Sequence, residues 1–158
     1  MKKIFVLILV SALCAVFCSC GALNIEDTNG DDPSLCSITE EDIVSGKVGS
    51  TTFASSKVTS NSGTVFKVKK MSGVYTLDTF KSSSKDNVIT FTLTPELKSG
   101  NLRVLLLSDG EVLADFPIGE TTTLMLDDPE CKYELVLAAE SAELSVKYRA
   151  TEIPSNNK

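Results

Sequence analysis

Apolar and polar residues alternate with a period of two along most of the chain after Thr51. The clearest stretch is residues 89–93, where Ile89, Phe91 and Leu93 are separated by threonines. Successive side chains of a strand point to opposite faces, so this pattern predicts strands with one buried and one solvated face. Similar alternation begins at each of the following positions: Phe66, Tyr75, Val112, Thr122, Tyr133 and Leu144.

Residues that favour turns separate these segments. Asp109-Gly110 predicts a tight hairpin, and Glu140-Ser141 predicts a second one. Pro117 predicts that the strand before it ends nearby or lies at a sheet edge, because proline lacks a donor for the ladder. Residues 102–107 are apolar on both faces except for Arg103, which predicts a central strand.

The pattern as a whole predicts seven to nine short strands and no long helix. We therefore expect an all-β domain over residues 37–153, an antiparallel β-sandwich of jelly-roll-like or immunoglobulin-like topology. One helical turn is expected in residues 37–44, where Ser37 or Thr39 would be the N-cap and Gly46 would end the turn. Residues 154–158 are predicted to be a polar tail.

Residues 1–19 have a different pattern, typical of a secretory signal helix. Lys2 and Lys3 precede an apolar run that extends to Phe17 with Ser11 as its one polar member, and small residues follow. The run is too short to cross a bilayer, since a transmembrane helix needs about 20 apolar residues. The sequence therefore predicts export from the cytoplasm.

The end of this segment, Phe17-Cys18-Ser19-Cys20-Gly21, resembles the lipobox of bacterial lipoproteins. In that family a small residue precedes a cysteine that is lipidated and becomes the new N-terminus. The resemblance implies that Ser19 is the small residue and that Cys20 carries acyl chains such as palmitate. Several acyl chains together hold a protein far more firmly on a membrane than one does. The implied location is extracytoplasmic, with a lipid anchor in the cell membrane.

Ordinary secretion is the alternative, with cleavage after Ala22 and a freely secreted product. In either case residues 20–36 are polar and acidic, and we expect them to form a tether between the membrane and the domain. Residues 27–32 imitate the start of a calcium loop, but Asp32 stands where the glycine is required and Ile38 where the bidentate glutamate is required. No metal site is predicted.

The net charge of the chain is −6, and without residues 1–19 thirteen basic residues stand against twenty-one acidic ones. A negative protein without an arginine-rich patch is not expected to bind nucleic acid. Residues 47–103 nevertheless carry nine basic residues against three acidic ones. Lys67, Lys69 and Lys70 are our candidates for a face that binds an anionic ligand. The simpler explanation is that these lysines cover solvated strand faces.

Cys36 and Cys131 remain if Cys20 is lipidated, and an oxidising compartment would allow them to form a disulfide. Two free thiols are the alternative. The chain has no histidine, so the commonest general base and metal ligand is missing, and no Gly-x-Ser-x-Gly motif accompanies its serines. We therefore predict a protein that is not an enzyme and that needs no cofactor.

Three later segments resemble small β-sandwich domains of proteins exported by Gram-positive bacteria. These segments are residues 97–104, residues 108–112 around Asp109-Gly110, and residues 132–136, where Cys131 replaces the usual glycine before Lys132-Tyr133. The resemblance implies a sandwich fold and supplies no catalytic residues. The function we expect is a non-catalytic binding module for an envelope polymer or a surface protein. The alternative is a structural or assembly subunit of a membrane complex.

Overall fold

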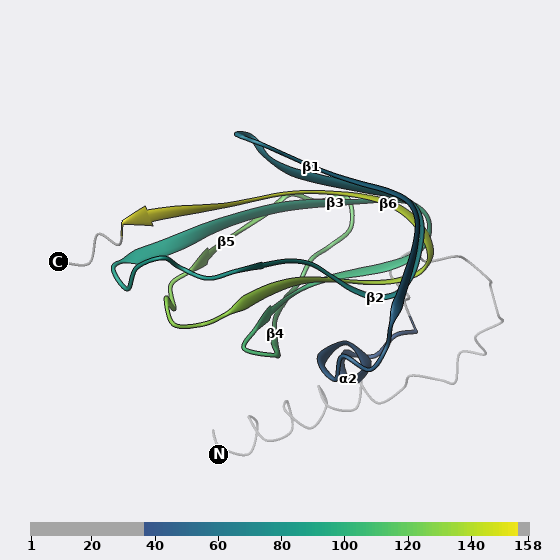
Figure 1. Cartoon of the computed structure of the whole chain (residues 1–158), viewed down its shortest axis with the longest axis horizontal. Helices are drawn as coiled ribbons and strands as arrows, with labels where there is room; N and C mark the ends of the chain where they lie inside the picture. The colour runs from purple at the N-terminus through teal and green to yellow at the C-terminus, as the bar shows by residue number, and fades with distance from the viewer. Residues whose placement is uncertain (1–36, 155–158) are drawn as a thin grey trace, which may run out of the picture. The chain divides into compact units, whose positions relative to one another are not determined.

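The computed structural model describes residues 37–154, which form one antiparallel sheet and one short helix (Figure 1). The predicted signal helix, the tether with Cys20 and Cys36, and residues 155–158 of the predicted tail lie outside the described residues. The elements are α2 (Glu40–Val44), β1 (Ser50–Ser60), β2 (Gly63–Phe80), β3 (Asn87–Ser108), β4 (Glu111–Asp115), β5 (Thr122–Leu126) and β6 (Tyr133–Pro154). The predicted all-β antiparallel fold is confirmed. None of the helices in this part of the chain has the length and apolarity needed to span a membrane.

The strand order is β1-β2-β6-β3-β4, and β5 pairs with β3. Strands β2, β3 and β6 are long, at 18, 22 and 22 residues, and each bends sharply so that its two halves belong to opposite layers (Figure 1). The first layer contains β1, β5 and residues 63–68, 87–97 and 144–154 of the long strands. The second layer contains β4 and residues 73–80, 101–108 and 133–140.

Residues with positive φ occur where the three long strands bend. Gly73 and Gly100 have φ of +94° and +79°, and Ser141 has φ of +51°. The ladders shift register at the same places, as expected of β-bulges, which bend a strand without ending it. The backbone N–H of Ser141 also donates to Ser72 Oγ at 2.9 Å, which ties the bend of β6 to that of β2.

The predicted hairpin at Glu140-Ser141 is wrong. β6 continues through these residues as one strand, which bends there but does not reverse direction. The segments predicted to begin at Phe66 and Tyr75 are both parts of β2, and residues 89–93 and 102–107 are both parts of β3. The prediction of seven to nine short strands is therefore wrong, since six strands are found in the described part. In a short hairpin a residue with positive φ allows the chain to reverse direction. Here it instead bends a continuous strand, which passes from one layer into the other.

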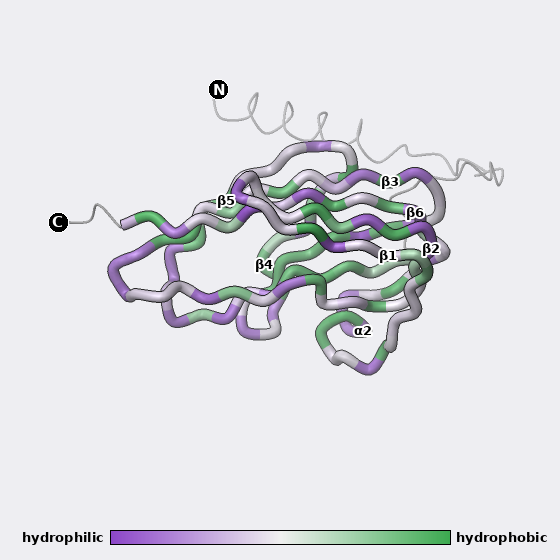
Figure 2. Tube along the Cα trace, turned by 45° about the horizontal axis from the view of Figure 1, so that its top comes forward, coloured by the Kyte–Doolittle hydropathy of each residue, from purple (hydrophilic) through white to green (hydrophobic). Residues whose placement is uncertain are grey.

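The main core lies between the two layers and is rich in leucine and aromatic residues. Phe91 is fully buried, and its ring contacts those of Phe80, Phe116 and Tyr148 at centroid distances of 5.2, 5.9 and 6.4 Å. The predicted central strand is confirmed: residues 102–107 are buried in β3 apart from Arg103. The hydropathy pattern in Figure 2 shows apolar and polar positions alternating along the strands around this core.

Helix α2 covers the outer side of the second layer. Ile43 packs there against Leu105, Leu107, Val136 and Ala138 in a second apolar cluster. This cover explains why β3 is apolar on both faces at this point. The other side of the same stretch faces the main core.

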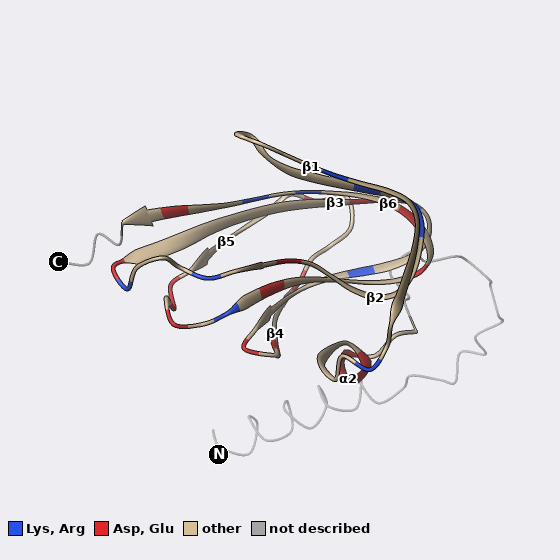
Figure 3. Ribbon diagram, viewed as in Figure 1, with Lys and Arg blue, Asp and Glu red and all other residues tan. Residues whose placement is uncertain are grey.

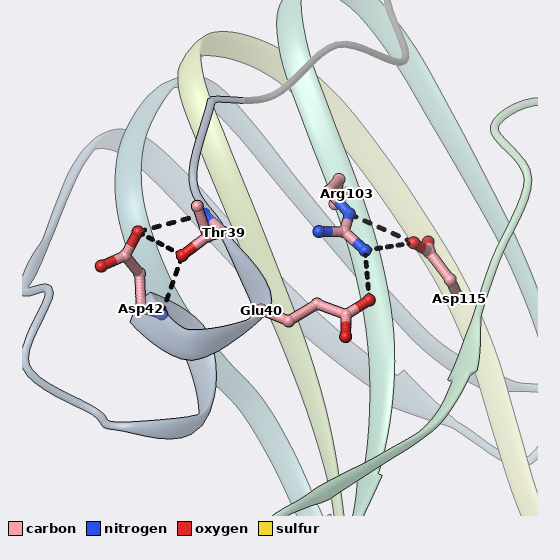
Figure 4. A network of polar contacts seen from close by, with 5 residues as sticks. All are labelled: Thr39, Glu40, Asp42, Arg103 and Asp115. Carbon is pink, nitrogen blue, oxygen red and sulfur yellow. Dashed lines mark hydrogen bonds and ion pairs between the residues drawn. The ribbon is translucent and has the colours of Figure 1, made fainter.

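Thr39, one of the two N-caps that the sequence predicted, caps α2. Its side chain accepts from the backbone N–H of Asp42, and the Asp42 carboxylate accepts from Thr39 in return (Figure 4). Arg103 on β3 then bridges Glu40 of the helix, at 3.1 Å, and Asp115 of β4, at 2.7 Å (Figure 4). The hydrogen bond to Asp115 is the main reason that the pKa of Arg103 is raised. The single charge inside the predicted central strand therefore anchors α2 and β4.

Candidate binding surface

The outer side of the first layer carries a group of cations that we call the basic face: Lys67 of β2 with Lys147 and Arg149 of β6. All three side chains are exposed, and they alternate along the strands with buried residues such as Tyr148. The register pairs Lys67 with Ser145, two positions from Lys147. Residues two apart on a strand lie about 7 Å apart on one face. Figure 3 shows Lys and Arg positions recurring along these strands of the first layer.

Threonines continue the basic face across β3 and β5. Thr92 pairs with Arg149 and Thr94 pairs with Lys147 in the ladder between β3 and β6. Thr92 also shares a hydrogen bond of 3.1 Å with Thr123 on β5. The result is a hydroxyl-rich surface with positive charges at one side and with the exposed carboxylate of Glu96, which pairs with Ser145, at its end toward the bend.

Within residues 37–154 the three cations of the basic face have no carboxylate partner, and the same holds for Lys47, Lys69, Lys70 and Lys81. The lysines and arginine with a carboxylate partner are Lys57, Lys85, Lys98, Arg103 and Lys132. An unpaired surface cation keeps its charge available to a ligand, because no neighbouring carboxylate neutralises it. The basic face is thus a place where three of these unpaired cations lie close together on two neighbouring strands.

The three lysines predicted from the sequence are all exposed, but they do not form one row. Lys67 belongs to the basic face, and Lys69 lies with it at a groove of about 340 Å³ near the bend of β2. An ion pair of 3.0 Å between Lys98 and Glu143 lies in the same groove. Lys70 lies farther along the bend, opposite Phe53 of β1.

Sequence reasoning missed Lys147 and Arg149 as partners of Lys67. Their alternation with buried residues showed that they point outward, but only the pairing of β2 with β6 brings them beside Lys67. Because β6 was predicted as two strands, its second half could not be placed next to β2. The local pattern shows which way these side chains point, but the strand order is needed to show which side chains are neighbours.

A second, larger pocket of about 470 Å³ opens beside the turn between β1 and β2. At its wall the Tyr148 hydroxyl donates to Asp78 Oδ2 at 2.6 Å. Outside the pocket lining, Lys57 Nζ donates to the Leu77 carbonyl at 2.9 Å and lies 3.4 Å from Asp78. Burial first, and then the bond to Asp78, raise the pKa of Tyr148, so this phenol stays protonated. Tyr148 belongs to the first layer and Asp78 to the second. The network therefore joins the two layers.

Cys131 is a free thiol among the described residues, just before β6. A hydrogen bond to Ser108 lowers its pKa, but bonds to Asp109 and Asp128 outweigh that effect and leave the pKa raised. A raised pKa makes the thiol a weak nucleophile. Its predicted partner Cys36 lies outside the described residues, so the disulfide stays a prediction.

Residues 37–154 contain no group of three His, Cys, Asp or Glu side chains placed to hold a metal ion. Comparison with known proteins gives no family model that matches this chain and no curated protein that matches it significantly.

Proposed function

We propose that this protein is a membrane-anchored surface lipoprotein whose domain binds an anionic envelope polymer without catalysing a reaction. The observation that carries the proposal is the basic face, where Lys67, Lys147 and Arg149 lie unpaired on one side of a protein with a net charge of −6. A positive patch on a negatively charged protein attracts polyanions, whereas the rest of the protein surface repels them. This contrast favours one orientation of the bound polymer.

The shape of the basic face favours a polymer over a small molecule. Small ligands usually bind in concave pockets that bury most of their surface. The basic face is instead an open sheet surface on which cations recur about every 7 Å along β6. Its threonine hydroxyls donate and accept hydrogen bonds, which suits the oxygen-rich backbone of a phosphate or uronate polymer.

The anchor is the second part of the proposal. The lipobox-like residues around Cys20 support lipidation there, and the acidic tether of residues 20–36 would hold the domain away from the negatively charged membrane surface. A domain held at the outer face of the membrane meets envelope polymers at high local concentration. Weak contacts with many repeating units are then sufficient for retention.

Reversing the charge of the basic face is expected to abolish this binding. The triple variant Lys67→Glu, Lys147→Glu, Arg149→Glu should bind a long-chain polyphosphate at least about tenfold more weakly than the unchanged protein. The full-length protein in detergent would be titrated with the polymer at several salt concentrations. Binding should weaken as salt rises, because exposed charges are screened beyond about 8 Å at physiological ionic strength.

The matched control is the triple variant Lys47→Glu, Lys70→Glu, Lys81→Glu, which changes the net charge equally at exposed, unpaired positions outside the basic face. It should keep most of the affinity, and a neutral dextran should bind neither protein. Equal losses in both variants, or binding that ignores salt, would contradict the proposal. If cross-linking in intact cells instead gives one dominant protein of another kind, the alternative of an assembly subunit is favoured.

A further inference from the structure

Strand β1 is a long sheet edge without a neighbour on its outer side in the described structure. Its eleven residues are all exposed, and β2 is its one hydrogen-bonded partner (Figures 1 and 2). The edge strands β4 and β5 have only five residues each. We propose that β1 pairs antiparallel with β1 of a second copy, which joins two domains through one continuous sheet. This inference stands apart from the polymer-binding proposal.

The composition of β1 lacks the features that normally protect an edge strand. Proteins block such edges with proline, with charged side chains or with very short strands. β1 has no proline and no acidic residue, and Lys57 is its one charged residue. Lys57 is turned inward, where it bonds to the Leu77 carbonyl and lies 3.4 Å from Asp78. The backbone donors and acceptors of β1 therefore remain open to another strand.

Two large apolar side chains of β1 are exposed on one side of the sheet. Phe53 is 70% exposed and Val58 is 63% exposed. Val58 pairs with Val65 on the outer side, and Phe53 pairs with Lys70 on the same side. Five positions would normally separate them onto opposite faces. An irregularity at Ala54, which has φ of +51°, brings them onto the same face.

This arrangement makes β1 complementary to itself. If the two-fold axis passes at Ser56, this serine faces the second copy's Ser56. With Ala54 as the extra residue on each strand, Phe53 then faces Val58 of the second copy, and the same pair recurs on the other side of the axis. Thr52 faces the second copy's Thr59 in the same register. Pairs of aromatic with β-branched residues and pairs of threonines each stabilise antiparallel strands by about 0.2–1 kcal/mol.

The cation nearest the two-fold axis is Lys57, and its charge is offset by Asp78, which lies 3.4 Å away. Strands lie about 4.8 Å apart, so Lys67 and the second copy's Lys67 would be about 14 Å apart, beyond the Debye length of about 8 Å. The two-fold axis is perpendicular to the sheet, so both basic faces would lie on the same side. Raising the salt concentration should therefore leave the pairing intact, whereas it should weaken polymer binding. The two proposals can therefore fail separately.

Cysteine cross-linking of the full-length protein in cultures of its own cells, cells and medium together, tests the pairing. The full-length Ser56→Cys variant should form a disulfide-linked dimer under mild oxidation, since directly opposed residues bring their Cβ atoms near the spacing that a disulfide needs. The control is Ser60→Cys, at the C-terminal end of the same exposed strand, where the proposed register keeps it far from Ser60 of the second copy. We expect at least about fivefold more dimer from Ser56→Cys.

A second variant shows whether the contact is the one described. Adding Phe53→Asp to Ser56→Cys should abolish the dimer, because it places a carboxylate opposite Val58 while leaving the core untouched. Circular dichroism would verify that this variant folds. The proposal is overturned if Ser56→Cys gives no dimer, if Ser60→Cys gives as much, or if Phe53→Asp leaves the yield unchanged. Loss of polymer binding has no bearing on these outcomes.

Discussion

Replacing Gly100 with alanine is expected to lower the free energy of unfolding by about 3 kcal/mol or more. Gly100 lies at the bend of β3 with φ of +79°. Residues other than glycine adopt this backbone conformation at a cost of about 1–3 kcal/mol. An added Cβ would also lie 2.5 Å from the Glu140 carbonyl oxygen and 2.7 Å from the carbonyl carbon of Ser141. These are backbone atoms of the adjacent bend of β6, which cannot move away without opening the corner of the sheet.

Gly119→Ala is the matched control for this substitution. Gly119 has φ of +84°, close to that of Gly100, but an added Cβ would meet nothing within 4 Å. The expected loss is only the conformational part, about 1 kcal/mol. Urea unfolding followed by circular dichroism gives both values. Equal losses would show that the backbone conformation alone matters and that the bends of β3 and β6 are not closely packed.

Replacing Phe91 with alanine is expected to destabilise the protein by about 3–5 kcal/mol. Phe91 is fully buried between the layers, where its ring contacts Phe80 from the second layer and Tyr148 from the first. Removing the ring loses its burial and leaves a cavity that the surrounding sheet fills only in part. The loss should exceed that of any single truncation on the basic face.

The control for Phe91 is Met125→Ala on β5. Met125 is 68% exposed, so its truncation should change the free energy of unfolding by less than about 0.5 kcal/mol. Both variants would be measured by the same urea titration. A similar small effect at Phe91 would mean that the two layers do not enclose a close-packed core.

The local pattern predicted strands well and their connections poorly. The alternation in residues 89–93, the hairpin at Asp109-Gly110 and the buried stretch of residues 102–107 were all found as predicted. Each of these depends on neighbouring residues alone. The bends at Gly73, Gly100 and Ser141 use the same residue types as tight turns, so a pattern read locally divided three long strands into six.

The same limit explains what was found and missed at the candidate binding surface. Lys67 was recognised because it lies among other lysines in sequence. Lys147 and Arg149 are 80 and 82 residues away in the chain and become its neighbours only through the register of β2 with β6. The role of Arg103 as a bridge between α2 and β4 could not be predicted from the sequence either. Its partners Glu40 and Asp115 come from a helix and an edge strand that no spacing rule connects.

The measurement that tests the account most directly is the intact mass of the protein isolated from its own cells, before and after reduction. We expect a polypeptide that begins at Cys20 and carries a diacylglyceryl adduct, because the binding module is proposed to act while anchored. A mass change on reduction would in addition reveal the predicted disulfide between Cys36 and Cys131. An unmodified polypeptide that begins at Leu23 would contradict the account and indicate a freely secreted protein.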